Sequence, residues 1–373
     1  MKSICYVTYQ SFPSLKANTI QTMANLKYMV KNGYHVELIF PLREKFSSDN
    51  LNELKTFYNF TEDIKITGIK HSYPFGKIKI LEKIFFLFSH MAWSRKIVKE
   101  IQKVNTHSTS FMTRSEWIAY YLSKYELNVI YECHQSSKIK SFLIPLILKS
   151  KQSNIIFLNE LLYKSFNIKN KHNKQINVLH NGVDTEFFQK GINMEKNSLV
   201  FVGNLLRFNK DRNVQFLIEL FKNNPALGQY KLKIIGGPED ERLKLDKQIF
   251  ESNLQNKIKT FGPLNRKDTI LEIQKSQIGL LINKSDNSHS THFTSPLKYF
   301  EYLYGGLKIV AVDFPAHRNL PFSEKILFFS ENNQKEFIDC LKDSQNTNSF
   351  AKNKLNTVSL DYRSKKIIEI IET

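Results

Sequence analysis

The segment HFTSPLKYFEYLYGGLKIVAVD, residues 292–313, contains the signals for a helix, a stop and a buried strand in succession. Ser295 and Pro296 predict the start of the helix, because Ser accepts hydrogen bonds from first-turn N–H groups and Pro tolerates the first helical position. The helix should continue to Tyr304, where two glycines end it before the strand KIVAVD. The start of such a helix binds anions, since its N–H groups and its dipole favour phosphate.

The same alternation of helix and strand continues on both sides of this segment. Short β-branched or aromatic runs such as ICYVTY, HVELIF, NVIYECH, LVFVGN and KLKIIGG are separated by longer stretches with helical spacing. A repeated βα order predicts parallel sheets with helices on both faces, which is an α/β fold. At 373 residues the chain is long enough for two domains of this kind.

The polar stretch NIKNKHNKQ, residues 167–175, separates two series of strands. We therefore expect a Rossmann-like domain over residues 1–175 and a second one over residues 176–358. The amphipathic segment 359–373 should form a helix that crosses back to the first domain. Two doubly wound domains that face each other would hold their ligands at the strand ends, in the cleft between them.

Positive charge is concentrated in the first half of the chain. Lys and Arg number 54 against 35 Asp and Glu, a net charge of +19, and residues 1–180 contain 26 basic and 12 acidic residues. An excess of this size indicates a polyanionic partner such as nucleic acid, an anionic membrane or a phosphorylated substrate. Lys accounts for 45 of the 54 basic residues, and a coding sequence rich in A and T also produces such an excess of Lys. The shortage of Arg disfavours a protein that recognises the bases of nucleic acid.

Cysteine usage and hydropathy indicate a protein of the reducing cytoplasm. Cys5, Cys133 and Cys340 lie far apart and form no C-x-x-C pair, so neither a disulfide framework nor a zinc site is expected. The start of the chain lacks a signal-peptide run, and no stretch reaches the ~18 apolar residues of a membrane span. The apolar run IFFLFSHMAW lies within a Lys-bearing helical segment, residues 77–103, and predicts a core helix or a helix at a membrane interface.

Charged side chains accompany the predicted anion site of residues 292–313. Lys298 and Glu301 are three residues apart and therefore share a helix face. The cation suits a diphosphate, and the carboxylate suits the paired hydroxyls of a ribose. A surface ion pair on an ordinary capped helix explains the same two residues and stays open as an alternative.

A second basic segment, FVGNLLRFNKDRNVQFLIELF, begins at a strand end marked by Gly203. Arg207, Lys210 and Arg212 come next in the loop before an amphipathic helix. Cations at the carboxyl end of a strand are well placed to neutralise a pyrophosphate. A solvated basic loop is the alternative.

Two further segments place polar residues at a turn or at a strand end. Asn181 and Gly182 predict a turn, and Asp184 should cap the segment after it. In NVIYECH, His134 comes directly after a buried strand, where site residues collect in open α/β sheets. A lone histidine is more often structural than catalytic, but its position here favours a site.

Taken in order, these segments resemble the GT-B-fold glycosyltransferases of family 4, a group of retaining enzymes that use nucleotide-sugar donors. The matching segments are SFPSLKANTIQTMANLKYMVKNGYHVELIFP, FMTR, VIYECH, NGVDTEFF, VFVGN, KLKIIGGPE, IKTFGPL and SPLKYFEYLYGGLKIVAVDFP. They extend over nearly the whole chain, and the last of them is the specific one. The resemblance implies two facing Rossmann-like domains, of which the first binds the acceptor and the second the donor.

The resemblance also implies roles for residues of the second domain, two of them catalytic. Glu301 would bind the donor ribose. Arg212 would hold the departing diphosphate from the place of the family's usual lysine, with Asn213 at the place of its glycine. The other donor-binding residues that the resemblance implies are Gly203, Arg207, Lys210, Gly236 and Gly262 around the diphosphate and the base, and Ser295, Pro296, Leu297 and Lys298 in the phosphate region.

In the first domain the resemblance implies a site for the transferred sugar and the acceptor. His134 is the third implied catalytic residue and would lie near the transferred sugar. The loop from Phe12 to Asn18, which includes Pro13 and Ala17, would close over the cleft from the acceptor side.

One departure from the family pattern concerns the donor sugar. Many members have two glutamates eight positions apart, but Phe293 stands eight positions before Glu301. The sequence is similar instead to the branch with S-P-x-K before the surviving glutamate. Phosphate and ribose binding are retained in this interpretation, whereas the donor sugar and the effect of Phe293 on activity are left open.

The reaction that the resemblance implies is transfer of a sugar, with retention, from a nucleoside diphosphate to a hydroxyl of a glycan or lipid-linked acceptor. No D-x-D pair is present, so no metal is expected, and cations and helix N–H groups would stabilise the leaving group instead. No cofactor is implied beyond the nucleotide-sugar co-substrate, for which a UDP- or GDP-linked donor is favoured. Bacterial surface polysaccharide or lipopolysaccharide synthesis suits such an acceptor, with the protein cytoplasmic or peripheral at the inner face of the cell membrane.

Three other functions remain open on the sequence alone. A nucleotide-sugar epimerase of similar architecture would act on the donor without an acceptor. A non-enzymatic polyanion-binding protein would explain the charge of +19, although no nucleic-acid-binding module is recognisable and no nucleic-acid partner is expected. An inactive glycan-binding or scaffold protein is compatible with Phe293 at the place of a glutamate.

Overall fold

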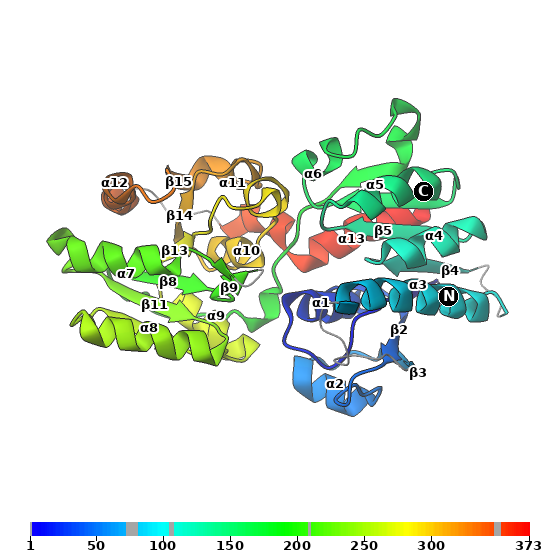
Figure 1. Cartoon of the computed structure of the whole chain (residues 1–373), viewed down its shortest axis with the longest axis horizontal. Helices are drawn as coiled ribbons and strands as arrows, with labels where there is room; N and C mark the ends of the chain where they lie inside the picture. Colours follow the sequence, from blue (N-terminus) through cyan, green and yellow to red (C-terminus); the bar gives the residue numbers. More distant parts are fainter. Residues whose placement is uncertain (1, 72–80, 104–107, 208–209, 347–351) are drawn as a thin grey trace. The chain divides into compact units, whose positions relative to one another are not determined.

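The computed structural model describes residues 2–71, 81–103, 108–207, 210–346 and 352–373. The chain divides into two units, which are drawn in Figure 1. Unit 1 comprises residues 1–179 together with 360–373, and unit 2 comprises residues 180–359. The first boundary therefore falls four residues later than the one expected from the polar stretch.

Unit 1 contains a seven-stranded sheet in which all neighbouring strands are parallel, in the order β3-β2-β1-β4-β5-β6-β7. Its strands are β1 (Ser3–Val7), β2 (His35–Leu42), β3 (Lys65–Lys70), β4 (Thr109–Thr113), β5 (Val129–Cys133), β6 (Ser153–Phe157) and β7 (Ile176–Val178). Its helices are α1 (Ala17–Lys31), α2 (Leu51–Tyr58), α3 (Glu82–Ile101), α4 (Glu116–Lys124), α5 (Lys138–Ile147), α6 (Glu160–Lys164) and α13 (Leu360–Glu372).

Two predictions for unit 1 differ from the structure, one at the boundary of the domain and one at the ends of a helix. The segment Ile176–Val178 was expected to open the second domain, but it forms β7 and pairs with β6 at the edge of the first sheet. The helix expected over residues 77–103 is α3, Glu82–Ile101, and residues 77–80 lie outside the described residues.

Unit 2 contains a six-stranded parallel sheet in the order β12-β11-β8-β13-β14-β15, and a small antiparallel hairpin. The sheet strands are β8 (Ser198–Val202), β11 (Lys231–Ile235), β12 (Ile258–Phe261), β13 (Ile278–Leu281), β14 (Lys308–Val312) and β15 (Ile326–Phe329), and the hairpin is β9 (Leu206–Arg207) with β10 (Lys210–Asp211). The helices are α7 (Val214–Asn223), α8 (Glu239–Glu251), α9 (Arg266–Gln274), α10 (Leu297–Tyr304), α11 (Pro315–Arg318) and α12 (Gln334–Asn346).

The sheet of unit 2 is buried on both faces, as the βα order predicts. Leu199 and Phe201 of β8 point into a cluster that includes side chains of α7, α8 and α12, such as Phe216, Leu245 and Phe337. Val200, between the first two, belongs to a second cluster with side chains of α9 and α10. Successive strand residues point to opposite faces, so helices must cover both sides of the sheet.

The last helix, α13, packs on unit 1 although it comes after unit 2 in the sequence. Its buried residues are Leu360, Arg363, Ser364 and Ile367, a spacing that places them on one helix face. Ile367 joins the core that α1 shares with the sheet. The helix is therefore part of the first hydrophobic core.

The strand order reverses beside β1 in unit 1 and beside β8 in unit 2. Ligands of open parallel sheets bind outside the carboxyl ends of the strands at such a point. The prediction of two doubly wound, Rossmann-like domains is confirmed. The three cysteines are buried and free, and none of the helices in the described ranges is long and apolar enough to cross a membrane.

Candidate functional site

In unit 2, two of the predicted glycines meet at the carboxyl ends of neighbouring strands. Gly203 follows β8 with φ +142°, and Gly236 follows β11 with φ +146°. A Cβ atom on Gly236 would collide with the carbonyl oxygen of Gly203, so the two backbones touch where side chains would otherwise separate them. Gly262 follows β12 at the same edge of the sheet.

The predicted basic loop divides into two parts. Lys210 lies on the hairpin, is exposed, and forms an ion pair with Asp286 at 3.4 Å. The guanidinium of Arg212 lies instead at the strand end, where its Nη1 would be 3.3 Å from a Cβ atom on Gly203. Arg207 belongs to β9, and its side chain is not among the described atoms. Of the two loop cations whose side chains are described, Lys210 and Arg212, only Arg212 lies at the edge of the sheet.

The geometry around Arg212 explains the asparagine that comes next. Asn213 has φ +69°, a left-handed conformation that Asn tolerates better than most residues other than Gly. The carboxylate of Asp211 accepts hydrogen bonds from the N–H groups of Asn213 and Val214, at 2.9 and 3.2 Å, and so caps the start of α7.

The helix expected after Ser295 is α10, and it ends at Tyr304 before two glycines as predicted. One detail of its start was wrong, because the Ser295 hydroxyl does not cap the helix. Its Oγ accepts a hydrogen bond from the N–H of Asn181 at 3.1 Å, and the Asn181 amide donates to the Ser295 carbonyl at 2.6 Å. No turn forms at Asn181 and Gly182, where one was predicted, and Asn181 instead holds the residue that leads into α10. Among the described residues, no side chain caps the first turn of α10.

Lys298 and Glu301 are both buried, which disfavours the alternative of an ordinary surface ion pair. Lys298 Nζ lies 3.9 Å from the centre of the Phe201 ring, a cation–π contact with β8. Glu301 Oε1 pairs with Nη2 of Arg266, the first residue of α9, at 2.7 Å. The pattern of residues 292–313 gave no signal for Arg266, because it lies 35 positions before its partner.

The charges of this site also shift the pKa of neighbouring groups. Burial, followed by the charges of Lys298 and Arg212, lowers the pKa of His317 to about 4, although its hydrogen bond to the Val312 carbonyl opposes the shift. Burial raises the pKa of Tyr302, and both Glu301 and Arg212 act on it. Arg212 beside Gly203, Lys298 over Phe201 and Glu301 paired with Arg266 therefore lie near the carboxyl ends of β8 and β12.

In unit 1, His134 follows β5 beside a buried cluster of charges. Glu132 accepts hydrogen bonds from Arg363 of α13 and from Arg114, which follows β4. Burial raises the pKa of Glu132, but Arg363 and Arg114 outweigh it and hold the pKa at about 2. The carboxylate is thus ionised between two arginines that lie far apart in the sequence.

The same surroundings keep His134 neutral. Burial, and then the positive charge of Arg114, lower the pKa of His134 well below its usual range. Its Nε2 atom is buried and makes no hydrogen bond to any described residue. A buried polar atom without a partner is costly unless a ligand or water satisfies it, so this nitrogen is suited to a hydroxyl group.

The loop predicted to lie on the acceptor side is shorter than expected. Ala17 and Asn18 form the first turn of α1, so the loop that contains Pro13 ends at Lys16. The carbonyl of Asn18 accepts a hydrogen bond from Arg114 Nη1 at 3.3 Å, which links the start of α1 to the cluster around Glu132.

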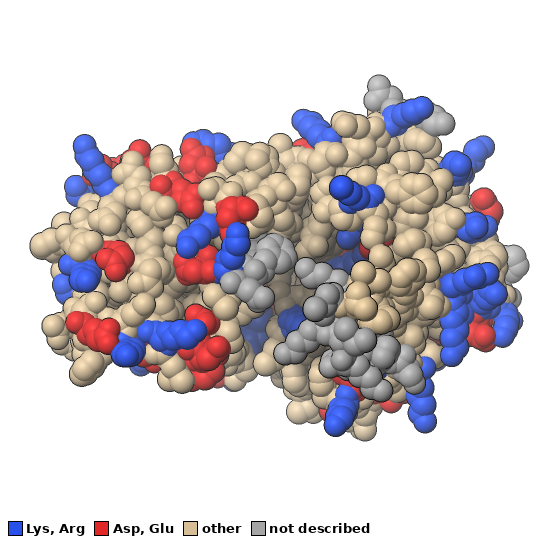
Figure 2. All heavy atoms as spheres, viewed as in Figure 1, with Lys and Arg blue, Asp and Glu red and all other residues tan. Residues whose placement is uncertain are grey.

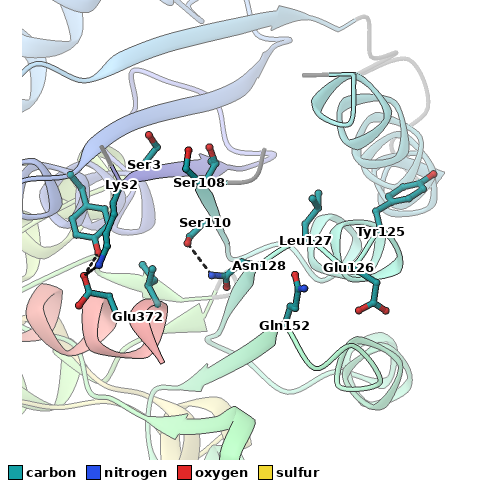
Figure 3. Close-up of a pocket in the computed structure, with 13 residues that line it drawn as sticks. Lys2, Ser3, Ser108, Ser110, Tyr125, Glu126, Leu127, Asn128, Gln152 and Glu372 are labelled. Atoms are coloured by element: carbon teal, nitrogen blue, oxygen red, sulfur yellow. Dashed lines mark hydrogen bonds and ion pairs between the residues drawn. The ribbon is translucent and has the colours of Figure 1, made fainter. Parts of the chain in front are cut away.

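Unit 1 also contains a pocket of about 700 Å³, whose lining is drawn in Figure 3. Its lining includes Ser3, Thr109, Asn128 and Gln152, which lie at or just before the amino ends of β1, β4, β5 and β6. His134 lies at the opposite, carboxyl edge of the same sheet. The pocket is therefore separate from the predicted site, and among the described residues no group of three or more His, Cys, Asp or Glu could hold a metal ion.

Comparison with known proteins finds one family model that matches most of unit 2. Residues 182–353 match the family model described as glycosyl transferases group 1, a range that includes every predicted site residue of unit 2. No relative was found among curated protein sequences.

Several solved structures share the fold of the whole chain. A glycosyltransferase from Rickettsia africae is 15% identical with a TM-score of 0.67, covering 100% of this chain and 98% of that one. The lipopolysaccharide outer core galactosyltransferase WaaB is 13% identical with a TM-score of 0.66, covering 99% of each chain. An Escherichia coli structure described as trehalose-6-phosphate bound with UDP-2-fluoro glucose is 11% identical with a TM-score of 0.68, covering 100% and 99%. At these identities the likeness establishes a shared fold.

Proposed function

We propose that this chain is a retaining glycosyltransferase of family 4, which transfers a sugar from a nucleoside diphosphate to a hydroxyl of a glycan or lipid-linked acceptor. One observation carries the proposal: Arg212, Lys298, Glu301 and the start of α10 lie near the carboxyl edge of the unit 2 sheet, as their contacts with Gly203, Phe201 and Arg266 show. The match of residues 182–353 to glycosyl transferases group 1 supports glycosyl transfer by this unit.

In this proposal unit 2 binds the donor. Arg212 and the first-turn N–H groups of α10 neutralise the diphosphate, because cations and helix starts favour phosphate. Glu301, held by Arg266, accepts hydrogen bonds from the ribose hydroxyls. Gly203 and Gly236 let the nucleotide approach the backbone at the strand ends. Support for a UDP-linked donor comes from the UDP-2-fluoro glucose named for one structure of the same fold.

The chemical step requires stabilisation of an oxocarbenium-like sugar and of a departing diphosphate. Fixed cations and N–H groups stabilise the developing negative charge without reorganisation. The leaving phosphate oxygen takes the proton of the acceptor hydroxyl, which attacks from the same face and thereby retains the anomeric configuration. Neutral His134 orients a hydroxyl of the transferred sugar through its buried Nε2. Phe293 stands at the place of the glutamate that contacts the donor sugar in many members of the family. Because Phe has no carboxylate, groups such as His134 make the contacts to the sugar hydroxyls instead.

In this proposal unit 1 binds the acceptor, which is a lipid-linked glycan of bacterial surface polysaccharide or lipopolysaccharide synthesis. Binding takes place at the cytoplasmic face of an anionic membrane. The net charge of residues 1–180 supports it, since 26 basic residues stand against 12 acidic ones. One structure of the same fold is named as a lipopolysaccharide galactosyltransferase.

Binding of UDP, GDP, ADP, CMP and dTDP, followed as a thermal shift, tests the donor site, because a ligand of the folded state raises the melting temperature. We expect UDP or GDP to raise it, and Glu301→Gln and Arg212→Ala to reduce that shift.

With the donor identified, each of these variants should also lower turnover at least tenfold, since a lost electrostatic partner costs roughly 2 to 4 kcal/mol in the transition state. Exposed Glu251→Gln and Lys222→Ala are the matched controls. Near-normal activity in both site variants, with folded protein, would contradict the assignment.

A further inference from the structure

The solvent face of α3 in unit 1 is unusual because its first half is apolar. Ile84, Phe85 and Phe88 are 50%, 37% and 58% exposed, and Leu81, just before the helix, is 39% exposed. The spacing of these four residues, 81-84-85-88, places them on one helix face. Trp93, on another face of the same helix, belongs to the buried core of the unit. Large apolar side chains therefore lie on the solvent side of α3 as well as on its core side.

The second half of the same face is basic. Arg95, Lys96 and Lys99 are exposed, and their spacing places them on the same helix face as the four apolar residues. None of the three forms an ion pair with a residue that the structure describes. Figure 2 shows Lys and Arg atoms gathered at the right of the molecule, over the end of α3.

We propose that this face of α3, defined by Leu81, Ile84, Phe85 and Phe88 and by Arg95, Lys96 and Lys99, docks unit 1 on an anionic lipid bilayer. Large apolar side chains enter the boundary between headgroups and acyl chains, while the cations at the other end of the face neutralise anionic headgroups. The positive charge of the first half of the chain makes an acidic lipid surface the complementary partner. The inference rests on the membrane part of the proposed function and is independent of glycosyl transfer.

Sedimentation of the full chain with vesicles tests the proposal. We expect binding to vesicles of phosphatidylglycerol and phosphatidylethanolamine, little binding to vesicles of phosphatidylcholine alone, and weakening as salt rises. Phe85→Ser with Phe88→Ser should reduce vesicle affinity about tenfold or more, because two large apolar contacts are lost. Lys96→Gln with Lys99→Gln should reduce it about fivefold for each lysine removed.

Matched controls come from unit 2. Phe250 and Leu243 of α8 are 69% and 55% exposed, and Lys222 and Lys231 are exposed as well. The double changes Phe250→Ser/Leu243→Ser and Lys222→Gln/Lys231→Gln therefore remove two large apolar groups and two cations elsewhere. These controls should bind vesicles as the parent chain does. All variants should keep the parent's thermal shift with nucleotide, which separates membrane docking from the donor site.

Three results would overturn the proposal. The first is no binding to anionic vesicles at low salt while the nucleotide shift persists. The second is an equal loss of binding in the α3 variants and in the unit 2 controls. The third is a dimer in gel filtration that Phe85→Ser/Phe88→Ser converts to a monomer, which would assign the face to a second copy of this chain instead.

Discussion

Two glycines, Gly203 and Gly236, determine how closely the strand ends of unit 2 approach each other. The change Gly236→Ala forces a Cβ atom against the backbone of Gly203 at a positive φ, so we expect it to lower the free energy of unfolding of unit 2 by more than about 3 kcal/mol. Gly191 also has a positive φ, +76°, but a Cβ there meets nothing within 4 Å. Gly191→Ala should therefore cost only about 1 kcal/mol. Denaturant titration of both variants measures the difference, and equal losses would show that the contact with Gly203 is unimportant.

Single residues were predictable from the sequence where local backbone geometry decides them. Asn213 at the place of a glycine is explained by its left-handed backbone, and the stop of α10 agrees with the two glycines after it. Partners distant in the sequence were not predictable. The ion pair of Glu301 with Arg266 and the hydrogen bond of Ser295 with Asn181 depend on tertiary packing, which no local pattern encodes.

At the scale of elements, α13 contributes a buried charge to unit 1. Replacing Arg363 by Met leaves the buried carboxylate of Glu132 with one arginine, so unfolding free energy should fall by about 3 to 5 kcal/mol. Changing Glu132→Gln in the same chain should recover part of that loss, since the uncompensated charge is then gone. The exposed pair of Arg318 with Asp313 is the control, and Arg318→Met should cost less than about 1 kcal/mol.

A double-mutant cycle in denaturant unfolding measures this coupling. If Arg363→Met and Glu132→Gln simply add, the two side chains do not depend on each other and the pair is not what fixes α13.

The elements themselves were largely predictable, because βα alternation and apolar runs specify parallel strands. The exceptions lie at the boundaries. β7 was assigned to the wrong unit because a three-residue strand after a polar stretch contains no signal for the sheet that it joins. The loop before α1 was predicted too long because no side chain in the described part of the chain caps that helix, so the sequence contains no capping signal for its start.

At the scale of the whole molecule, buried histidines in both units should make the protein sensitive to acid. Burial lowers the pKa of His90 and of His317 to about 4, and that of His134 well below its usual range. Unfolded histidines bind protons below about pH 6.5, whereas these three stay neutral in the folded chain. Stability should therefore be fully present above about pH 6.5 and decline as the pH falls toward about 4, by roughly 1 kcal/mol per pH unit for each histidine.

Urea unfolding at a series of pH values between about 7.5 and 4.5 measures this decline. His90→Gln and His317→Gln should flatten the curve where they fold. A stability that does not change across this range would mean that the three imidazoles are not buried as neutral groups.

The position of α13 also affects the order in which the chain can fold during synthesis. Unit 2 is continuous in the sequence, so it can fold as soon as residues 180–359 have left the ribosome. Unit 1 begins earlier, but it lacks α13 until all of unit 2 has been translated. On the nascent chain Glu132 therefore cannot pair with Arg363 until a further 231 residues have been translated. Unit 1 is thus begun before unit 2 and completed after it, because Arg363 must be translated before the surroundings of His134 are complete.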